Sequence, residues 1–72
     1  MIIIPMQLDV LTAKAGGWRW RLQAIENSAI SWLSTFEGFP TVAAAQADAH
    51  QRITAFNVQY ARKIKMTYEH QK

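Results

Sequence analysis

The segment best suited to recognition chemistry runs from Trp18 to Ala24, where apolar and polar residues alternate without interruption. Its polar members are Arg19, Arg21 and Gln23. A guanidinium group binds a carboxylate, a phosphate or a guanine edge through two parallel hydrogen bonds. Because alternate residues of a strand share one face, we expect the two guanidinium groups and the amide on one surface. Such a surface favours the binding of a macromolecule.

The remaining reactive side chains show no spacing that suggests catalysis or metal binding. The chain has no cysteine, which removes disulfides, thiolate metal sites and cysteine nucleophiles. His50 and His70 lack an acidic or histidine neighbour at ligand spacing, so we interpret both as surface residues. The acidic residues are scattered and suggest no pair of general acid and base: Asp9, Glu26, Glu37, Asp48 and Glu69. We therefore expect no enzyme, no cofactor, no metal ion and no small-molecule substrate.

The length and composition of the chain predict a single domain over residues 1–72. A core of this size supplies only about 3 to 5 kcal/mol unless disulfides, metal or association add to it. Half of the residues are hydrophobic and 18% are charged, which argues against disorder. Three Trp, three Phe and two Tyr are a large apolar load for so short a chain, so we expect a homodimer.

The basic character of the chain leaves two classes of partner open. A net charge of +3 and a pI of about 9.7 are compatible with nucleic acid or with an acidic protein surface. Four of the eight basic residues lie in the C-terminal tail, where they could serve solubility alone: Arg62, Lys63, Lys65 and Lys72. No segment approaches the roughly 20 apolar residues that cross a bilayer, so we expect a cytoplasmic location and no membrane partner.

Alternation of apolar and polar residues predicts three strands in the first half of the chain. The expected ranges are residues 2–10, 17–24 and 28–36. Pro5 has no N–H to donate, so the first strand should lie at a sheet edge or contain a bulge. Short turns separate the three ranges, and we therefore expect an antiparallel meander.

The second half of the chain has the apolar spacing of a helix. Apolar residues recur at intervals of three and four as far as Tyr60, which predicts a helix over residues 42–62. Thr41 fits the N-cap position. Residues 63–68 are compatible with an extension of that helix or with a short fourth strand. The sequence thus predicts an α+β fold in which one helix packs on one face of a three-stranded antiparallel meander.

One face of such a sheet stays uncovered and is either solvated or used for binding. We place Trp18 and Trp20 beneath the helix, because the reverse orientation would bury two arginines without partners. The uncovered face is then expected to carry residue types that are typical of interaction hot spots: Arg19, Arg21, Gln23, Ile30, Trp32 and Ser34. In the alternative interpretation the arginines are merely solvated, and Trp32 is buried against the first strand or a neighbouring subunit.

The pattern of Trp18-Arg19-Trp20-Arg21-Leu22, Asn27 in the following turn, and Gly38-Phe39 before an alanine-rich helix is shared with a known family. Over residues 17–53 the chain resembles the short YegP-type domain, a family of uncharacterised function with a βββα repeat. The resemblance implies the same order of elements and no defined activity.

A second pattern consists of Trp32-Leu33-Ser34-Thr35-Phe36, followed by Thr41, by residues 43–45 and by Asp48. It is similar to the strand-to-helix signature of the plant ethylene-response DNA-binding domain and of its relatives at the N-termini of mobile-element integrases. In that family a three-stranded sheet enters the major groove. The resemblance implies that Trp32 faces DNA and that Arg19, Arg21 and Gln23 lie on the same side.

These observations predict a non-catalytic accessory protein that binds a macromolecule through the uncovered sheet face. A protein is the expected partner, because only two of the eight basic residues fall on that face. A homodimer joined at an edge strand or at part of the face is also expected, and an adaptor or inhibitor of phage or mobile-element type fits this size. The alternative is a DNA-binding protein in which Arg21 and Gln23 contact bases, while Arg19, Arg62 and Lys63 contact phosphates.

Overall fold

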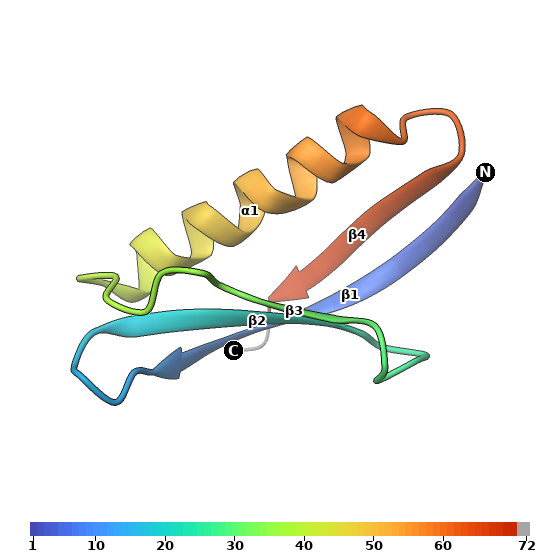
Figure 1. Cartoon of the computed structure of the whole chain (residues 1–72). Helices are drawn as coiled ribbons and strands as arrows, with labels where there is room; N and C mark the ends of the chain where they lie inside the picture. The colour runs from blue at the N-terminus through green and yellow to red at the C-terminus, as the bar shows by residue number, and fades with distance from the viewer. Residues whose placement is uncertain (71–72) are drawn as a thin grey trace.

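The computed structural model describes residues 1–70, which form four strands and one helix (Figure 1). The elements are β1 (Ile2–Thr12), β2 (Trp18–Ala24), β3 (Ser31–Leu33), α1 (Val42–Gln59) and β4 (Ile64–His70). The strands make one sheet in the order β3-β2-β1-β4, and α1 packs across one face of it. Strands β1, β2 and β3 are an antiparallel meander. The expected α+β fold is therefore confirmed.

The chain after the helix forms β4, which lies parallel to β1 with Ile2 opposite Ile64. The helix ends at Gln59, earlier than the expected residue 62. A turn follows in which the N–H of Lys63 donates to the carbonyl of Tyr60 at 2.9 Å. Of the two interpretations of residues 63–68, the strand is correct from Ile64 onward.

The start of α1 agrees with the capping pattern of the sequence. Thr41 has extended backbone angles, and its hydroxyl accepts a hydrogen bond from the N–H of Ala44 at 3.0 Å. In the part of the chain that the structure describes, no helix is long and apolar enough to cross a membrane.

Pro5 lies in the interior of the sheet, because β4 flanks β1 on the side opposite β2. The expectation that the first strand is an edge strand is therefore wrong. The sheet tolerates this proline because β2 ends at Ala24, opposite Met6, so Pro5 lies just past the paired part of β2. Its carbonyl still accepts a hydrogen bond from the N–H of Ile25 at 3.0 Å.

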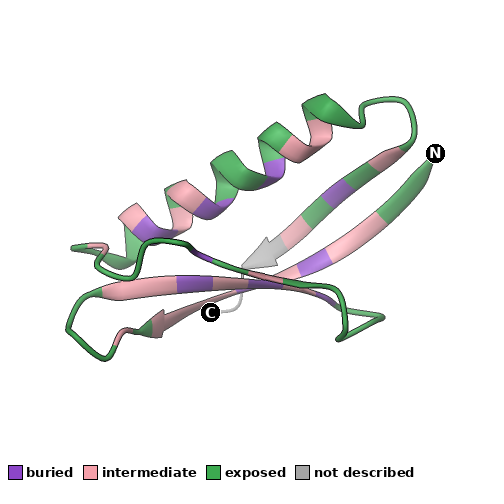
Figure 2. Cartoon of the chain, in the orientation of Figure 1, coloured by how far each residue is buried: buried purple, intermediate pink, exposed green. Residues whose placement is uncertain are grey.

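The hydrophobic core lies between α1 and the even-numbered residues of β1, β2 and β4 (Figure 2). Trp20 is only 3% exposed, and it lies under the helix as the sequence predicts. Ala45 and Ala49 are wholly buried, so their small side chains let the helix backbone approach the sheet. The buried apolar residues are Met6, Leu8, Trp20, Leu22, Ala24, Ala45, Ala49, Ile53 and Met66. Their burial fixes which side of the sheet remains uncovered.

The third strand is much shorter than the expected range 28–36, since β3 contains only three residues. The side-chain oxygen of Asn27 accepts from the N–H of Ala29 at 3.1 Å, and the Asn27 carbonyl accepts from Ile30 at 3.0 Å. These contacts bend the chain before β3 begins. After β3 the chain leaves the ladder and returns only for an isolated bridge between Phe39 and Trp18.

Candidate functional site

The sheet face opposite α1, which we call the open face, is built by alternate residues of all four strands. The register places Gln7 opposite Gln23 and Asp9 opposite Arg21. Directly opposed residues of neighbouring strands point to the same side, so the open face can be followed from strand to strand. Its residues are Ile3, Pro5, Gln7, Asp9 and Leu11 of β1, Arg19, Arg21 and Gln23 of β2, Ser31 and Leu33 of β3, and Lys65 and Thr67 of β4.

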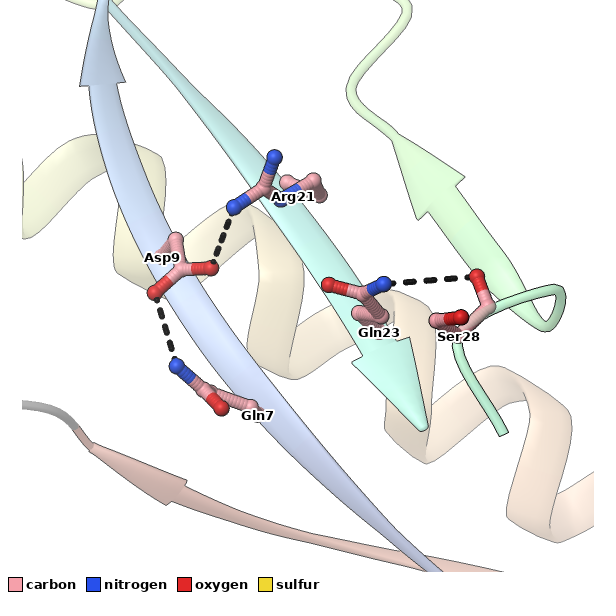
Figure 3. Close-up of polar contacts among 5 residues, drawn as sticks. All are labelled: Gln7, Asp9, Arg21, Gln23 and Ser28. Carbon is pink, nitrogen blue, oxygen red and sulfur yellow. Dashed lines mark hydrogen bonds and ion pairs between the residues drawn. The ribbon is translucent and has the colours of Figure 1, made fainter. Parts of the chain in front are cut away.

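An ion pair occupies the middle of the open face (Figure 3). Nη2 of Arg21 lies 2.9 Å from Oδ2 of Asp9, and Nε2 of Gln7 donates to Oδ1 of the same carboxylate at 3.3 Å. The Asp9 side chain is 17% exposed, whereas that of Arg21 is 42% exposed. A partly solvated pair of this kind contributes about 1 kcal/mol. The positive charge of Arg21 is thus largely neutralised within the chain.

Arg19 and Gln23 also lie on the open face, as expected, and each has a partner. Nη1 of Arg19 lies 3.0 Å from Oε1 of Glu37, in the segment between β3 and α1. Nε2 of Gln23 donates to the carbonyl of Ser28 at 3.3 Å (Figure 3). Among the described residues, Arg19 and Arg21 each use one terminal nitrogen in these contacts. The other terminal nitrogen of each remains a donor for an outside acceptor.

The expectation that Trp32 and Ser34 lie on the uncovered face together with Ile30 is wrong for Trp32 and Ser34. Trp32 is directly opposite Leu22, whose side chain is buried under the helix, so the indole points to the helix side. Its ring centroid lies 5.3 Å from that of Phe56 in α1. Ser34 is buried, and its hydroxyl accepts from the N–H of Trp20 at 3.2 Å. Ile30 lies just before β3, where its carbonyl accepts a hydrogen bond from the N–H of Ala24 at 2.9 Å, and it is 37% exposed.

Trp32 faces the helix rather than the open face, and it lines a groove between α1 and β3 that the sequence did not predict. The groove has a volume of about 510 Å³. Its lining residues are Trp20, Ser31, Trp32, Leu33, Thr35, Asp48, Gln51 and Arg52. The guanidinium carbon of Arg52 lies 4.6 Å from the centre of the Trp32 ring system, and Asp48 accepts a hydrogen bond from Nε1 of Trp20 at 2.8 Å. Aromatic, cationic and anionic groups therefore meet on the helix side of the sheet.

Arg62 and Lys63, which were expected to contact phosphates together with Arg19, do not lie near the arginines of β2. The carbonyl of Lys63 accepts from the N–H of Ile2, whereas Arg19 lies opposite Leu11. The strand from Ile2 to Leu11 spans about 30 Å. Arg62 and Lys63 thus lie at the opposite end of the sheet from Arg19.

Of the two histidines, only His50 has a side chain within the described part of the chain. His50 is exposed on α1, and its Nδ1 lies 2.6 Å from the hydroxyl of Tyr68. Among the side chains that the structure describes, no three of His, Asp and Glu lie close enough together to hold a metal ion. The side chains of Glu69 and His70, and all of Lys72, lie outside the described part of the chain.

No protein-family model, curated protein or solved structure matches this chain significantly. The resemblances to the YegP-type domain and to the ethylene-response DNA-binding domain therefore stay predictions from the sequence.

Proposed function

We propose that this chain is a non-catalytic accessory protein of the cytoplasm, an adaptor or inhibitor whose open face is a protein-binding surface. The observation that carries the proposal is the ion pair of Asp9 and Arg21 at the centre of that face. A face whose charges are balanced internally suits the mixed surface of a protein better than a polyanion. Arg21 keeps one terminal nitrogen for a carbonyl or carboxylate of the partner, and buried arginines are frequent hot spots of protein interfaces.

The margins of the open face add apolar contact area to this polar centre. Ile3 is 61% exposed at one end of the face, and Leu33 is 56% exposed beside Arg21 at the β3 margin. Leu11, which lies opposite Arg19, is half-buried at the other end of β1. An interface gains most of its affinity from such desolvated apolar groups, and the central polar groups fix its orientation.

A second copy of the chain is the simplest partner for this surface. A two-fold dimer brings the same patch of both subunits together, so the patch must complement itself. The open face meets that condition because Arg21 and Asp9 provide charges of both signs within one short distance. We therefore propose a homodimer that forms through the open face rather than through a strand edge.

The test is the substitution Gln7→Lys, which places a long charged side chain in the middle of the open face. The introduced ammonium group lies beside Asp9, so the fold keeps a favourable contact in place of the 3.3 Å hydrogen bond. Gln59→Lys makes the same exchange at an exposed position of α1 and is the matched control. Sedimentation equilibrium should give a dimer mass for the parent and for Gln59→Lys, and a monomer mass for Gln7→Lys. A parent that stays monomeric up to millimolar concentration refutes the homodimer.

DNA binding is the second candidate, and one observation favours it: Arg19, Arg21 and Gln23 follow one another along the open face of β2. Both guanidinium groups are, however, paired with carboxylates of the chain. A DNA-binding sheet should lose affinity for duplex DNA steeply as salt rises, and Arg19→Ala with Arg21→Ala should abolish that binding. Unchanged duplex binding by the double variant would remove this candidate.

A further inference from the structure

The two edges of the sheet differ in how their backbone groups are satisfied. At the β4 edge, the side-chain amide of Asn57 in α1 pairs with Met66 in the manner of a neighbouring strand. Oδ1 of Asn57 accepts from the N–H of Met66 at 2.7 Å, and Nδ2 donates to the Met66 carbonyl at 2.9 Å. The N–H of Ile64 donates to the carbonyl of Tyr60 at 3.0 Å. The helix and its following turn therefore close much of this edge against another strand.

Among the described residues, none satisfies the backbone groups of the β3 edge in this way. The N–H of Ser34 donates to the Trp20 carbonyl at 3.0 Å, and the Ile30 carbonyl accepts from Ala24 at 2.9 Å. In an antiparallel pair, residues that bond to the neighbouring strand alternate with residues whose backbone groups point away. The N–H and C=O groups of Ser31 and Leu33 therefore point outward from the sheet, where an added strand would find them.

A cation lies beside these outward groups. The guanidinium of Arg52 lies over the Trp32 ring and borders the same groove as Ser31 and Leu33. Arg52 forms no hydrogen bond or ion pair with any described residue. Stacking on the indole restricts the orientation of the guanidinium but leaves its edge donors unused. Those donors match a carboxylate, which accepts two parallel hydrogen bonds from a guanidinium.

The other charge of the groove is already engaged. Asp48 precedes Arg52 by one helical turn, and its Oδ2 accepts from Nε1 of Trp20 at 2.8 Å. No ion pair joins Asp48 to Arg52 among the described contacts. The groove thus requires of a partner an extended backbone at β3 and an acceptor group for the unused donors of Arg52, while Asp48 keeps its own negative charge.

A second copy of the chain does not meet this demand. Antiparallel pairing of two β3 edges about a two-fold axis at Trp32 would place each Trp32 opposite its copy. Each Arg52 lies over its own Trp32, so the two guanidinium groups would approach one another. Like charges facing each other oppose association. The residues that would enter the pairing, Ser31 to Leu33, include no acid.

We propose that the β3 edge binds an extended segment of a different protein, which adds a strand next to Ser31 and Leu33 and directs an Asp or Glu side chain toward Arg52. Main-chain hydrogen bonds supply the affinity of such strand addition, and the pocket for one side chain supplies its specificity. This binding site uses the backbone edge of β3 and the helix side of the sheet; it shares Ser31 and Leu33 with the open face but does not include Gln7, Asp9 or Arg21.

The test uses a phage-displayed library of short random peptides, selected on the immobilised parent protein. We expect β-branched sequences with Asp or Glu enriched at one fixed position. Exchanging that acid for its amide in a selected peptide should weaken binding about tenfold, the effect of one charge-assisted hydrogen bond. Recovery of no peptide, or of peptides without an enriched acid, overturns the proposal.

Variants of the protein locate the site of binding. Arg52→Ala should abolish the preference for the acid, whereas Arg62→Ala, at an exposed arginine outside the groove, should keep it. Asp48→Asn retains an acceptor for Trp20 and removes the neighbouring negative charge, so it should tighten binding of the acidic peptide. An unchanged acid preference in Arg52→Ala overturns the proposal.

Hydrogen exchange and the Gln7→Lys variant of the open face complete the test. The amide protons of Ser31 and Leu33 should exchange more slowly when the selected peptide is bound, because they become donors to it. Gln7→Lys should bind the peptide as well as the parent does, so failure of the homodimer leaves this result unaffected. Unprotected amides at both positions would show that the peptide does not extend the sheet, which contradicts the proposal.

Discussion

Asp9 determines the character of the open face, because it places a carboxylate directly opposite Arg21. Without Asp9 the face would present Arg21 and Lys65 without a carboxylate beside the paired Arg19 and Glu37, a more basic surface that suits a phosphate backbone better. With Asp9 the charges at the centre of the open face are balanced, which favours a protein over nucleic acid as the proposed partner. Sequence patterning identified the arginines but not this carboxylate, since the register between the two strands was needed to bring them together.

The ion pair makes a prediction at the scale of single residues. Asp9→Asn keeps the shape of the side chain and removes its charge, so the free energy of unfolding should fall by about 1 kcal/mol in low salt. The loss should shrink at high salt, because this pair is partly solvated. Urea denaturation of the two single variants and of the double variant with Arg21→Met measures the coupling. An equal cost of Asp9→Asn with and without Arg21 would show that the pair contributes nothing.

Trp32 shows where reasoning from single residues fails. In β2 the contrast between indoles and guanidinium groups is strong, and the structure places Trp20 inward and Arg21 outward accordingly. In the expected range 28–36 both alternate sets mix polar and apolar residues, and the strand that forms has only three residues. So short a strand has too little periodicity to fix its phase. Packing of the Trp32 ring against Phe56 decides it instead, and Leu33 is left exposed.

At the scale of elements, the turn between β1 and β2 sets the register that unites Asp9 with Arg21. Gly16 and Gly17 have φ values of +94° and +86°, which side chains other than hydrogen rarely permit. A Cβ at Gly17 would also lie 3.0 Å from the carbonyl oxygen of Phe39, whereas a Cβ at Gly16 would meet no atom within 4 Å. Both glycines therefore adopt a positive φ, but only Gly17 lies close to another segment of the chain.

This difference predicts unequal costs for two matched substitutions. Gly16→Ala should lower the free energy of unfolding by about 1 kcal/mol through its backbone angle alone. Gly17→Ala should cost about 2 to 3 kcal/mol, because it adds a backbone clash to the same angle. Thermal or urea denaturation of both variants makes the comparison. Equal losses would mean that the approach of Phe39 to Gly17 does not constrain the turn.

Asn57 makes a second prediction at this scale, because it joins α1 to the exposed side of β4. Asn57→Ala removes two hydrogen bonds to Met66 and should cost about 2 kcal/mol. It also opens the β4 edge, so association should rise at high concentration. Gln59→Ala, at an exposed position of the same helix, should change neither property. Light scattering and urea denaturation test both effects; an Asn57→Ala protein as stable and as monodisperse as Gln59→Ala would contradict this role.

At the scale of the whole molecule, the sequence predicted the helix and the three-stranded meander but not the full sheet. The apolar spacing of Ile64, Met66 and Tyr68 fits either a strand or the end of a helix, so periodicity alone could not choose. Once β4 pairs with β1, the first strand becomes an interior strand despite Pro5. Such long-range pairing depends on the path of the chain around α1, which no local pattern encodes.

The complete sheet gives the molecule two adjacent candidate surfaces, which meet at β3. The open face has a balanced polar centre with apolar margins, and the β3 edge with its groove has unused backbone groups and the Arg52 cation. Under the two proposals, the chain associates with its own copy through the open face and with an extended segment of another protein at the β3 edge. This arrangement suits an adaptor, which must hold two partners at once.

The most direct test of the central claim, that the open face is a binding surface, is a dilution series followed by amide NMR spectra. The account predicts concentration-dependent shifts for Gln7, Asp9, Arg21 and Gln23, and constant shifts along the exposed side of α1. Gln7→Lys should remove the concentration dependence. Shifts that move only on α1, or a spectrum that is unchanged at every concentration, would contradict the claim that the open face associates with a second copy.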